Sequence, residues 1–96
     1  MQDELKKERK YLSKSLGVLI KNLRESKGKS INLISNDIEL SKSVWADLEK
    51  GLNDPQFSTL WRISEALDLP LSEIILTLEI EIPEGWGFLI KDSYSH

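Results

Sequence analysis

The sequence predicts a mostly α fold, with five helices, an N-terminal helical extension and a short C-terminal pair of β-strands. Two observations predict the helices. Apolar residues recur at helical spacing, and Ser30 and Ser41 each precede such a run as N-cap residues. A third observation predicts the strands, because from Leu76 onwards apolar and polar residues alternate, which is typical of a strand with one buried face.

Length and composition limit the function classes. Ninety-six residues, 40% hydrophobic and 30% charged, predict one globular domain. The chain has no cysteine, which excludes a disulfide framework and a thiolate metal site. It has one histidine, so the sequence offers almost no residues for a histidine metal centre or for histidine acid-base catalysis. No nucleophile–base pair or phosphate-binding glycine loop indicates an enzyme or a cofactor. No apolar run is long enough for a membrane span, so we expect a cytoplasmic protein.

The chain opens with strong helix formers and no helix breaker from residue 2 to residue 14. We expect residues 1–15 to form a helical extension, continuous with a first helix that ends near Lys27, before Gly28. Its apolar stripe is Leu5, Leu12 and Leu16. Because its charges are mixed, a solvated extension is favoured over a basic arm that touches phosphates.

Two short helices follow. The first begins after Ser30 and carries isoleucine at helical spacing, and the second covers Lys42–Lys50 before a glycine stop at Gly51. Only residues 39–41 separate them. A connection this short makes the helices cross steeply, which is the helix-turn-helix geometry that places a second helix in the major groove of DNA.

The rest of the chain predicts two more helices and then the strands. We expect helix four over 57–67, and Pro70 in the first turn of helix five. Residues 76–82 are predicted as one strand and residues 86–91 as another, after a Pro-Glu-Gly turn. Their apolar face needs a cover, from this chain's own helices or from a second copy, and we expect dimerisation through residues 77–96. The residues expected to carry it are Leu78, Ile80, Ile82, Trp86 and Phe88.

An ordered set of residues covers some two thirds of the chain. Its members are Leu16, Gly17, Ile20, Leu23, Arg24, Ser30, Ile34, Ser35, Ile38, Ser41, Trp45, Leu48, Glu49, Gly51, Pro55, Leu60, Ile63, Ser64, Leu67 and the run 69–75. In this set the chain resembles the Cro/phage-repressor (XRE-type) helix-turn-helix family. The resemblance implies a five-helix, lambda-repressor-like helix-turn-helix domain over residues 16–76.

The resemblance also implies a function: a sequence-specific regulator, in this case a repressor, that binds palindromic double-stranded DNA as a homodimer. It implies an ion pair between Arg24 and Glu49. The pair joins helix one to the helix over Lys42–Lys50, which we call the reading helix, and orients the guanidinium near a phosphate. The DNA-binding positions it implies are Ser30, Asn32, Ser41, Lys42, Ser43, Ala46, Asp47, Lys50 and Asn53.

Some residues depart from the family's pattern. Ile31 stands where a phosphate-binding glutamine is usual, and Glu39 where glycine usually occupies the turn, so a non-glycine residue is expected at positive φ. Trp45 and Trp61 replace aliphatic residues, and we predict that both lie in the core.

The net charge of −3 and two acids, Asp47 and Asp54, keep a second function class open. This is a helix-turn-helix scaffold used for protein contact, such as an antitoxin bound to a cognate toxin or an adaptor. The acid gathers at the C-terminal end, with a net −3 over residues 77–96, and lysines flank the reading helix. These lysines are Lys27, Lys29, Lys42 and Lys50. We favour the DNA-binding regulator on the breadth of the resemblance.

Overall fold

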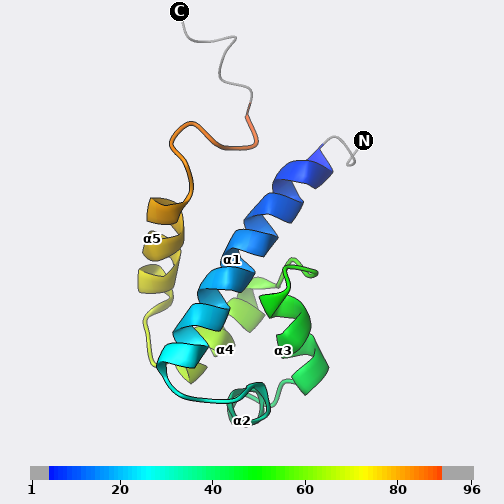
Figure 1. Ribbon diagram of the computed structural model, residues 1–96, viewed down its shortest axis with the longest axis vertical. Coiled ribbons are helices and arrows are strands. Elements are labelled where there is room, and N and C mark those ends of the chain that lie inside the picture. Colours follow the sequence, from blue (N-terminus) through cyan, green and yellow to red (C-terminus); the bar gives the residue numbers. More distant parts are fainter. Residues whose placement is uncertain (1–4, 90–96) are drawn as a thin grey trace, which may run out of the picture.

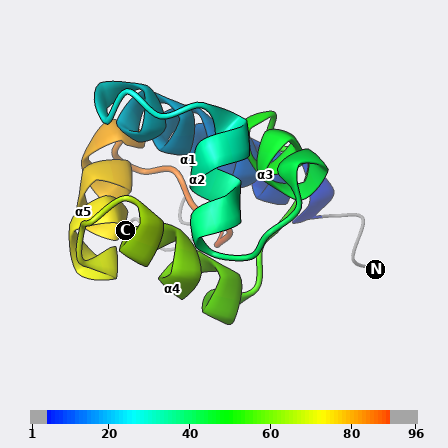
Figure 2. The same ribbon diagram turned by 90° about the horizontal axis from the view of Figure 1, so that it is seen from below.

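The computed structural model describes residues 5–89, which form a bundle of helices around the long first helix (Figure 1). The helices are α1 (Lys6–Ser26), α2 (Ile31–Asp37), α3 (Lys42–Glu49), α4 (Phe57–Ala66) and α5 (Leu71–Glu81). In Figure 1, α3 and α5 lie on opposite sides of α1. Seen from below, α2 lies between α3 and α4 (Figure 2).

The predicted N-caps of the two short helices are confirmed. The Ser30 Oγ accepts a hydrogen bond from the Leu33 amide at 3.1 Å, and the Ser41 Oγ accepts one from the Val44 amide at 3.2 Å. Each hydroxyl therefore satisfies one of the amides that the first turn of a helix leaves free. The capping serines fix where α2 and α3 begin.

The core lies where all five helices meet. Its buried apolar residues are Leu16, Leu19, Ile20, Ile34, Trp45, Leu48, Ile63, Ala66, Leu67, Ile74 and Leu78. Trp45 is wholly buried, as predicted. Trp61 is 53% exposed, so the prediction that it lies in the core is wrong. The face of α4 that packs inward carries Ile63 and Ala66, and Trp61 instead meets the exposed Phe57 ring edge to face, with 6.1 Å between ring centroids.

The predicted β-strand pair is wrong, because residues 5–89 contain no strand. Residues 71–81 are helical, since Ile74, Leu78 and Ile82 also recur every four residues and no breaker occurs before Pro83. A helix begun at residue 71 extends at little cost under these conditions. Of the predicted second strand, residues 86–89 are irregular, and residues 90 and 91 lie outside the described residues.

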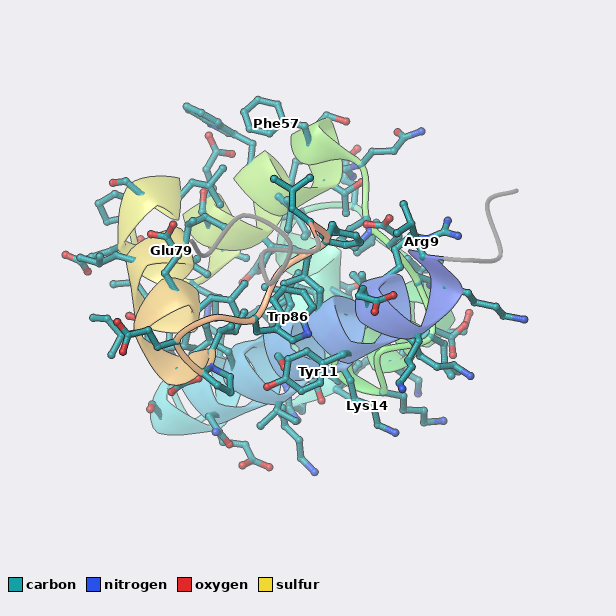
Figure 3. All side chains as sticks on the ribbon, turned by 90° about the horizontal axis from the view of Figure 1, so that it is seen from above. Arg9, Tyr11, Lys14, Phe57, Glu79 and Trp86 are labelled. Atoms are coloured by element: carbon teal, nitrogen blue, oxygen red, sulfur yellow. The ribbon has the colours of Figure 1, made fainter. Side chains whose placement is uncertain are left out.

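The segment after α5 returns to the N-terminal half of α1. The half-buried Trp86 ring packs on Tyr11, with 5.1 Å between the ring centroids, and on Phe88 at 5.6 Å (Figure 3). The residues predicted to form a dimer are thereby spread over different environments. Leu78 lies in the core, Ile80 is 73% exposed, and Ile82 packs against the edge of the core.

Two glycines bring α1 into backbone contact with the end of α3. A Cβ at Gly17 would lie 2.5 Å from the Leu48 carbonyl oxygen, and a Cβ at Gly51 would lie 2.6 Å from the Cα of Lys14. Gly51 also has a φ of +73°, which disfavours any side chain there. The two helices therefore pack without a side chain between them at these points.

Candidate nucleic-acid interface

The turn between α2 and α3 runs through residues 38–41, and Glu39 has a φ of 55°. The sequence predicts positive φ at this position, and the structure confirms it. The Leu40 amide donates to the Ser35 carbonyl at 2.9 Å, which closes the end of α2. The turn therefore keeps the left-handed geometry although an L-residue with a side chain occupies it.

Arg62 of α4 supports this turn from behind. Its Nη2 donates to the carbonyl oxygens of Ile38 and Glu39, the latter at 3.2 Å. These carbonyls lie beyond the end of α2, where no helical partner is available. Sequence reasoning missed Arg62, because its partners are backbone atoms more than twenty residues away and no side-chain pattern signals them.

The predicted ion pair between Arg24 and Glu49 is confirmed. The Arg24 Nε donates to Glu49 Oε2 at 2.5 Å and its Nη2 donates to Oε1 at 3.1 Å, the two-pronged geometry of a strong pair. The hydrogen bond that Arg24 donates to Glu49 raises the pKa of Arg24 above its usual value, against the opposing effect of burial. The pair ties α1 to the last turn of α3.

The same carboxylate also holds Trp45. The indole Nε1 donates to Glu49 Oε2 at 2.6 Å, a contact that the sequence analysis missed although the two residues stand at i and i+4 of one helix. The Arg24 Nη1 donates to the Lys29 carbonyl at 2.8 Å. Arg24 is only 9% exposed, so its guanidinium is engaged within the protein and fixes the orientation of α3.

The predicted contact positions fall on the α2–α3 unit and the loop that follows it. Seven are exposed, namely Ser30, Asn32, Ser41, Lys42, Ser43, Lys50 and Asn53, and two, Ala46 and Asp47, are half-buried. The first turn of α3 is therefore the most accessible part of the reading helix. The Oγ atoms of Ser41 and Ser43 lie 3.5 Å apart there.

Two of the four flanking lysines are paired within the molecule. The Lys27 Nζ lies 3.2 Å from Asp68 Oδ2, and the Lys29 Nζ lies 2.8 Å from Asp37 Oδ2. Within residues 5–89 the structure shows no ion pair for Lys42 or Lys50. The free positive charge around α3 is therefore smaller than a count of its lysines indicates.

Ile31, which replaces the usual polar residue, is half-buried and packs against the core. An aliphatic side chain in this place adds apolar contact and offers no hydrogen bond to a phosphate. Leu33, two residues on, is 52% exposed. The N-terminal turn of α2 is therefore more apolar than a phosphate contact requires.

No helix between residues 5 and 89 combines the length and the hydropathy needed to cross a bilayer.

Comparison with known proteins places this geometry in a family. The helix-turn-helix (HTH_3) family matches residues 20–74. The chain is 32% identical over 75 residues to the "ImmF control region 10 kDa protein" of Bacillus phage phi105, covering 78% of this chain and 82% of that protein. It is 30% identical over 64 residues to the "HTH-type transcriptional regulator SutR" of Escherichia coli K12, covering 67% of this chain but only 36% of that regulator.

Solved structures show the same fold. The clp gene regulator ClgR from C. glutamicum superposes with a TM-score of 0.70 at 18% identity, covering 76% of this chain and 95% of that one. An HTH_3 family transcriptional regulator from Vibrio cholerae gives 0.68 at 25% identity, covering 75% and 41%. With its capped α2–α3 unit and the Arg24–Glu49 pair, the chain therefore belongs to the Cro/C1-type helix-turn-helix family of DNA-binding transcription regulators.

Proposed function

We propose that this protein is a repressor that binds a palindromic DNA site as a homodimer, with α3 in the major groove. The observation that carries the proposal is the exposed first turn of α3, which presents Lys42 and Ser43. The buried Trp45 and the Glu49 side chain, which is 6% exposed, hold the other face of the same helix on the core. A reading helix needs both properties: donors directed at base edges, and a rigid attachment that fixes their position.

The charge around α3 supports a dimer. With Lys27 and Lys29 paired internally, Lys42 and Lys50 supply the local attraction to phosphate. Two cations give weak binding from one domain, since phosphate contacts provide most non-specific affinity. Two linked domains that read half-sites about 34 Å apart would gain affinity by acting together.

An apolar surface on α4 and α5 is available to join the two copies. Phe57 is 69% exposed, and a groove between the two helices holds about 590 Å³ and is lined by Trp61, Leu69, Leu71 and Ile75 among others. Large exposed apolar patches commonly mark protein interfaces. The proposed dimer uses this helical surface, and not the strand pairing that the sequence predicted.

Selection of duplexes from a random DNA library by the full chain, followed by fluorescence anisotropy on the selected duplex, tests the proposal. The double variant Lys42→Ala with Ser43→Ala is expected to weaken specific binding by about 1–3 kcal/mol with an unchanged circular dichroism spectrum. The control, Lys7→Ala with Ser26→Ala, removes the same groups from exposed positions outside both the α2–α3 unit and the α4–α5 groove. Equal affinities of the two double variants would contradict the placement of α3.

Asp47 gives a test of opposite sign. Its carboxylate is half-buried in the second half of α3. If it faces the groove, Asp47→Asn removes a repulsion from nearby phosphates and raises affinity for DNA of any sequence. Affinity that falls only on the selected duplex would instead assign Asp47 to a cytosine amine.

The second candidate function is a scaffold for protein contact. The exposed, edge-to-face Phe57–Trp61 pair favours it, as does the acidic Asp47 within α3. Binding of no duplex even at low salt, together with a stable complex with a protein partner, would establish this candidate in place of the first.

A further inference from the structure

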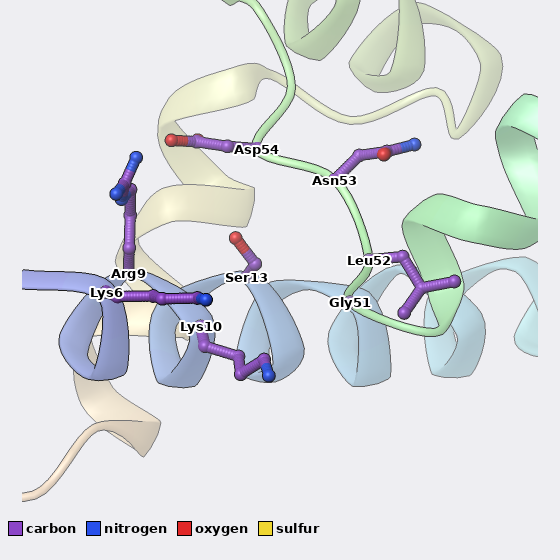
Figure 4. Close-up of a pocket in the computed structure, with 8 residues that line it drawn as sticks. All are labelled: Lys6, Arg9, Lys10, Ser13, Gly51, Leu52, Asn53 and Asp54. Atoms are coloured by element: carbon purple, nitrogen blue, oxygen red, sulfur yellow. The ribbon is translucent and has the colours of Figure 1, made fainter. Parts of the chain in front are cut away.

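A basic furrow separates the N-terminal half of α1 from the loop after α3. We call it the α1 furrow, and it holds about 290 Å³. Its lining residues are Lys6, Arg9, Lys10, Ser13 and the loop residues Gly51, Leu52, Asn53 and Asp54 (Figure 4). Figure 4 shows Arg9 and Ser13 directed toward the side of the helix on which the loop lies, while Lys6 runs along the helix and Lys10 points away from the loop. The furrow thus combines positive charge with two neutral polar groups, a hydroxyl and an amide.

This part of the protein is strongly basic although the whole chain is acidic. Residues 5–14 carry five basic side chains against one acidic, a net charge of +4, whereas the full chain carries −3. Lys6, Arg9 and Lys10 are all exposed, and none of the ion pairs found within residues 5–89 involves them. Lys27 and Lys29 differ, because both are paired inside the molecule. Within residues 5–89, the largest group of cationic side chains without an ion-pair partner therefore lies on α1 and not around α3.

The furrow is fixed relative to the reading helix and continuous with it. Lys50 is the exposed C-cap residue that follows α3, and the next four residues form one wall of the furrow. Gly51 packs so closely on the backbone of Lys14 that no side chain fits between them. A ligand that runs along α3 and past its C-terminal end therefore meets the furrow next.

We propose that the α1 furrow binds the phosphate backbone of duplex DNA beside the groove that α3 reads. This inference rests on the proposed function and extends its interface. Arg9 can grip a phosphate with two parallel donors, while Lys6 and Lys10 contribute point charges and the Asn53 amide a neutral donor. Asp54, on the same loop, opposes the anion and limits the strength of the contact.

The lining favours DNA over an acidic protein segment. Leu52 is the one apolar side chain that lines the furrow, and a docked helix or strand needs apolar anchors for stable binding. A phosphate chain needs only charge and donors in a row. The sequence alone favours a solvated extension, because mixed charges on a helix do not show which loop will face them.

The salt dependence of binding tests the proposal. The full chain is titrated onto a 30-bp duplex of random sequence by fluorescence anisotropy at several salt concentrations. Each phosphate contact contributes about −0.9 to the slope of log K against log salt. Arg9→Gln is therefore expected to make the slope shallower by about 1 on any sequence, and the combined Lys6→Gln, Arg9→Gln and Lys10→Gln variant by about 2–3. Asp54→Asn is expected to tighten binding.

Lys7→Gln is the matched control. It removes one positive charge from the same helix, next to Lys6, at a position that does not line the furrow. Its slope should stay that of the unmodified protein. A slope equally shallow in Lys7→Gln and Arg9→Gln would overturn the furrow as a contact and leave only a general effect of net charge.

The outcomes separate this inference from the function on which it rests. If the unmodified chain binds DNA and the triple variant keeps its slope, the furrow proposal is overturned while the proposed function stands. If the unmodified chain binds no duplex at low salt, both are overturned. Binding of a polyglutamate peptide, with a loss in the triple variant and no DNA binding, would assign the furrow to an acidic protein instead. Circular dichroism confirms that each variant is folded.

Discussion

The position of α3 against α1 depends on one side-chain group, the Glu49 carboxylate. It accepts from Arg24 at both oxygens and from the Trp45 indole at one. The Arg24 side chain is 11% exposed and that of Glu49 is 6% exposed, so water cannot replace a lost partner easily. Removing one member of a buried pair leaves the other charged and unsatisfied, which costs more than the pair contributes when complete.

Glu49→Ala is accordingly expected to lower the free energy of unfolding by about 3–5 kcal/mol, measured by urea denaturation. Trp45→Phe is the control, because it keeps most of the buried ring and removes only the indole donor, for an expected loss of about 0.5–3 kcal/mol. A loss below 1 kcal/mol in Glu49→Ala would show that the carboxylate is not needed to hold α1 and α3 together.

At the residue scale, the sequence predicts a contact when both partners stand at a recognisable spacing in the chain. It misses a contact whose partners have no fixed spacing. The Arg24–Glu49 pair was predicted because both residues fall in register with the resembled family, and the structure confirms it. Arg62 binds backbone carbonyls in a turn that only the fold brings near, so no residue pattern marks it. Trp61 has the helical spacing of a core residue, but spacing alone does not say which stripe of α4 faces inward.

At the element scale, α5 shows why a short apolar run is ambiguous. The alternation from Leu76 to Ile82 satisfies the period of a strand, and the same residues with Ile74 satisfy the period of a helix. The tertiary fold decides, since the helical arrangement buries Ile74 and Leu78 against the core. The sequence predicts the extents of α2 and α3 closely, because each has a capping serine before it, and it predicts the end of α1 before Gly28.

Leu78 and Ile80 distinguish the two arrangements in solution. In a strand the two side chains would share one face and contribute alike, whereas in α5 Leu78 is 7% exposed and Ile80 is 73% exposed. Leu78→Ala is expected to cost about 2–5 kcal/mol of unfolding free energy, and Ile80→Ala less than about 0.5 kcal/mol. Thermal or urea unfolding of both variants gives the comparison. Similar losses at the two positions would contradict the helix.

At the scale of the whole molecule, the two ends of the described chain support each other. The N-terminal half of α1 extends beyond the main core, and Trp86 from the far end of the chain packs on Tyr11 there. Trp86 and Leu12 also line one cavity with Leu78 and Ile82. The N-terminal half of α1 is thus held in its helical structure partly by its contacts with Trp86.

Trp86→Ala is therefore expected to loosen the N-terminal half of α1 without unfolding the core. A pair of packed rings contributes up to about 1.5 kcal/mol beyond its buried area, so amide exchange in residues 10–14 should rise roughly tenfold. Amides in α3 and α4 should keep their protection, as should all regions in the control Leu76→Ala, which truncates a side chain that is 54% exposed and lines neither the α4–α5 groove nor the cavity beside Trp86. Uniform loss of protection across the molecule would show that Trp86 supports the whole fold.

The glycine contacts between α1 and α3 have a mechanical consequence. Because backbone meets backbone at Gly17 and Gly51, no flexible side chain can absorb relative movement of the two helices. They behave as one lever, with the exposed N-terminal half of α1 as its long arm and α3 as its short one. A force applied to α1 near Lys6 therefore tilts α3. A ligand that holds the N-terminal half of α1 also sets the angle of α3.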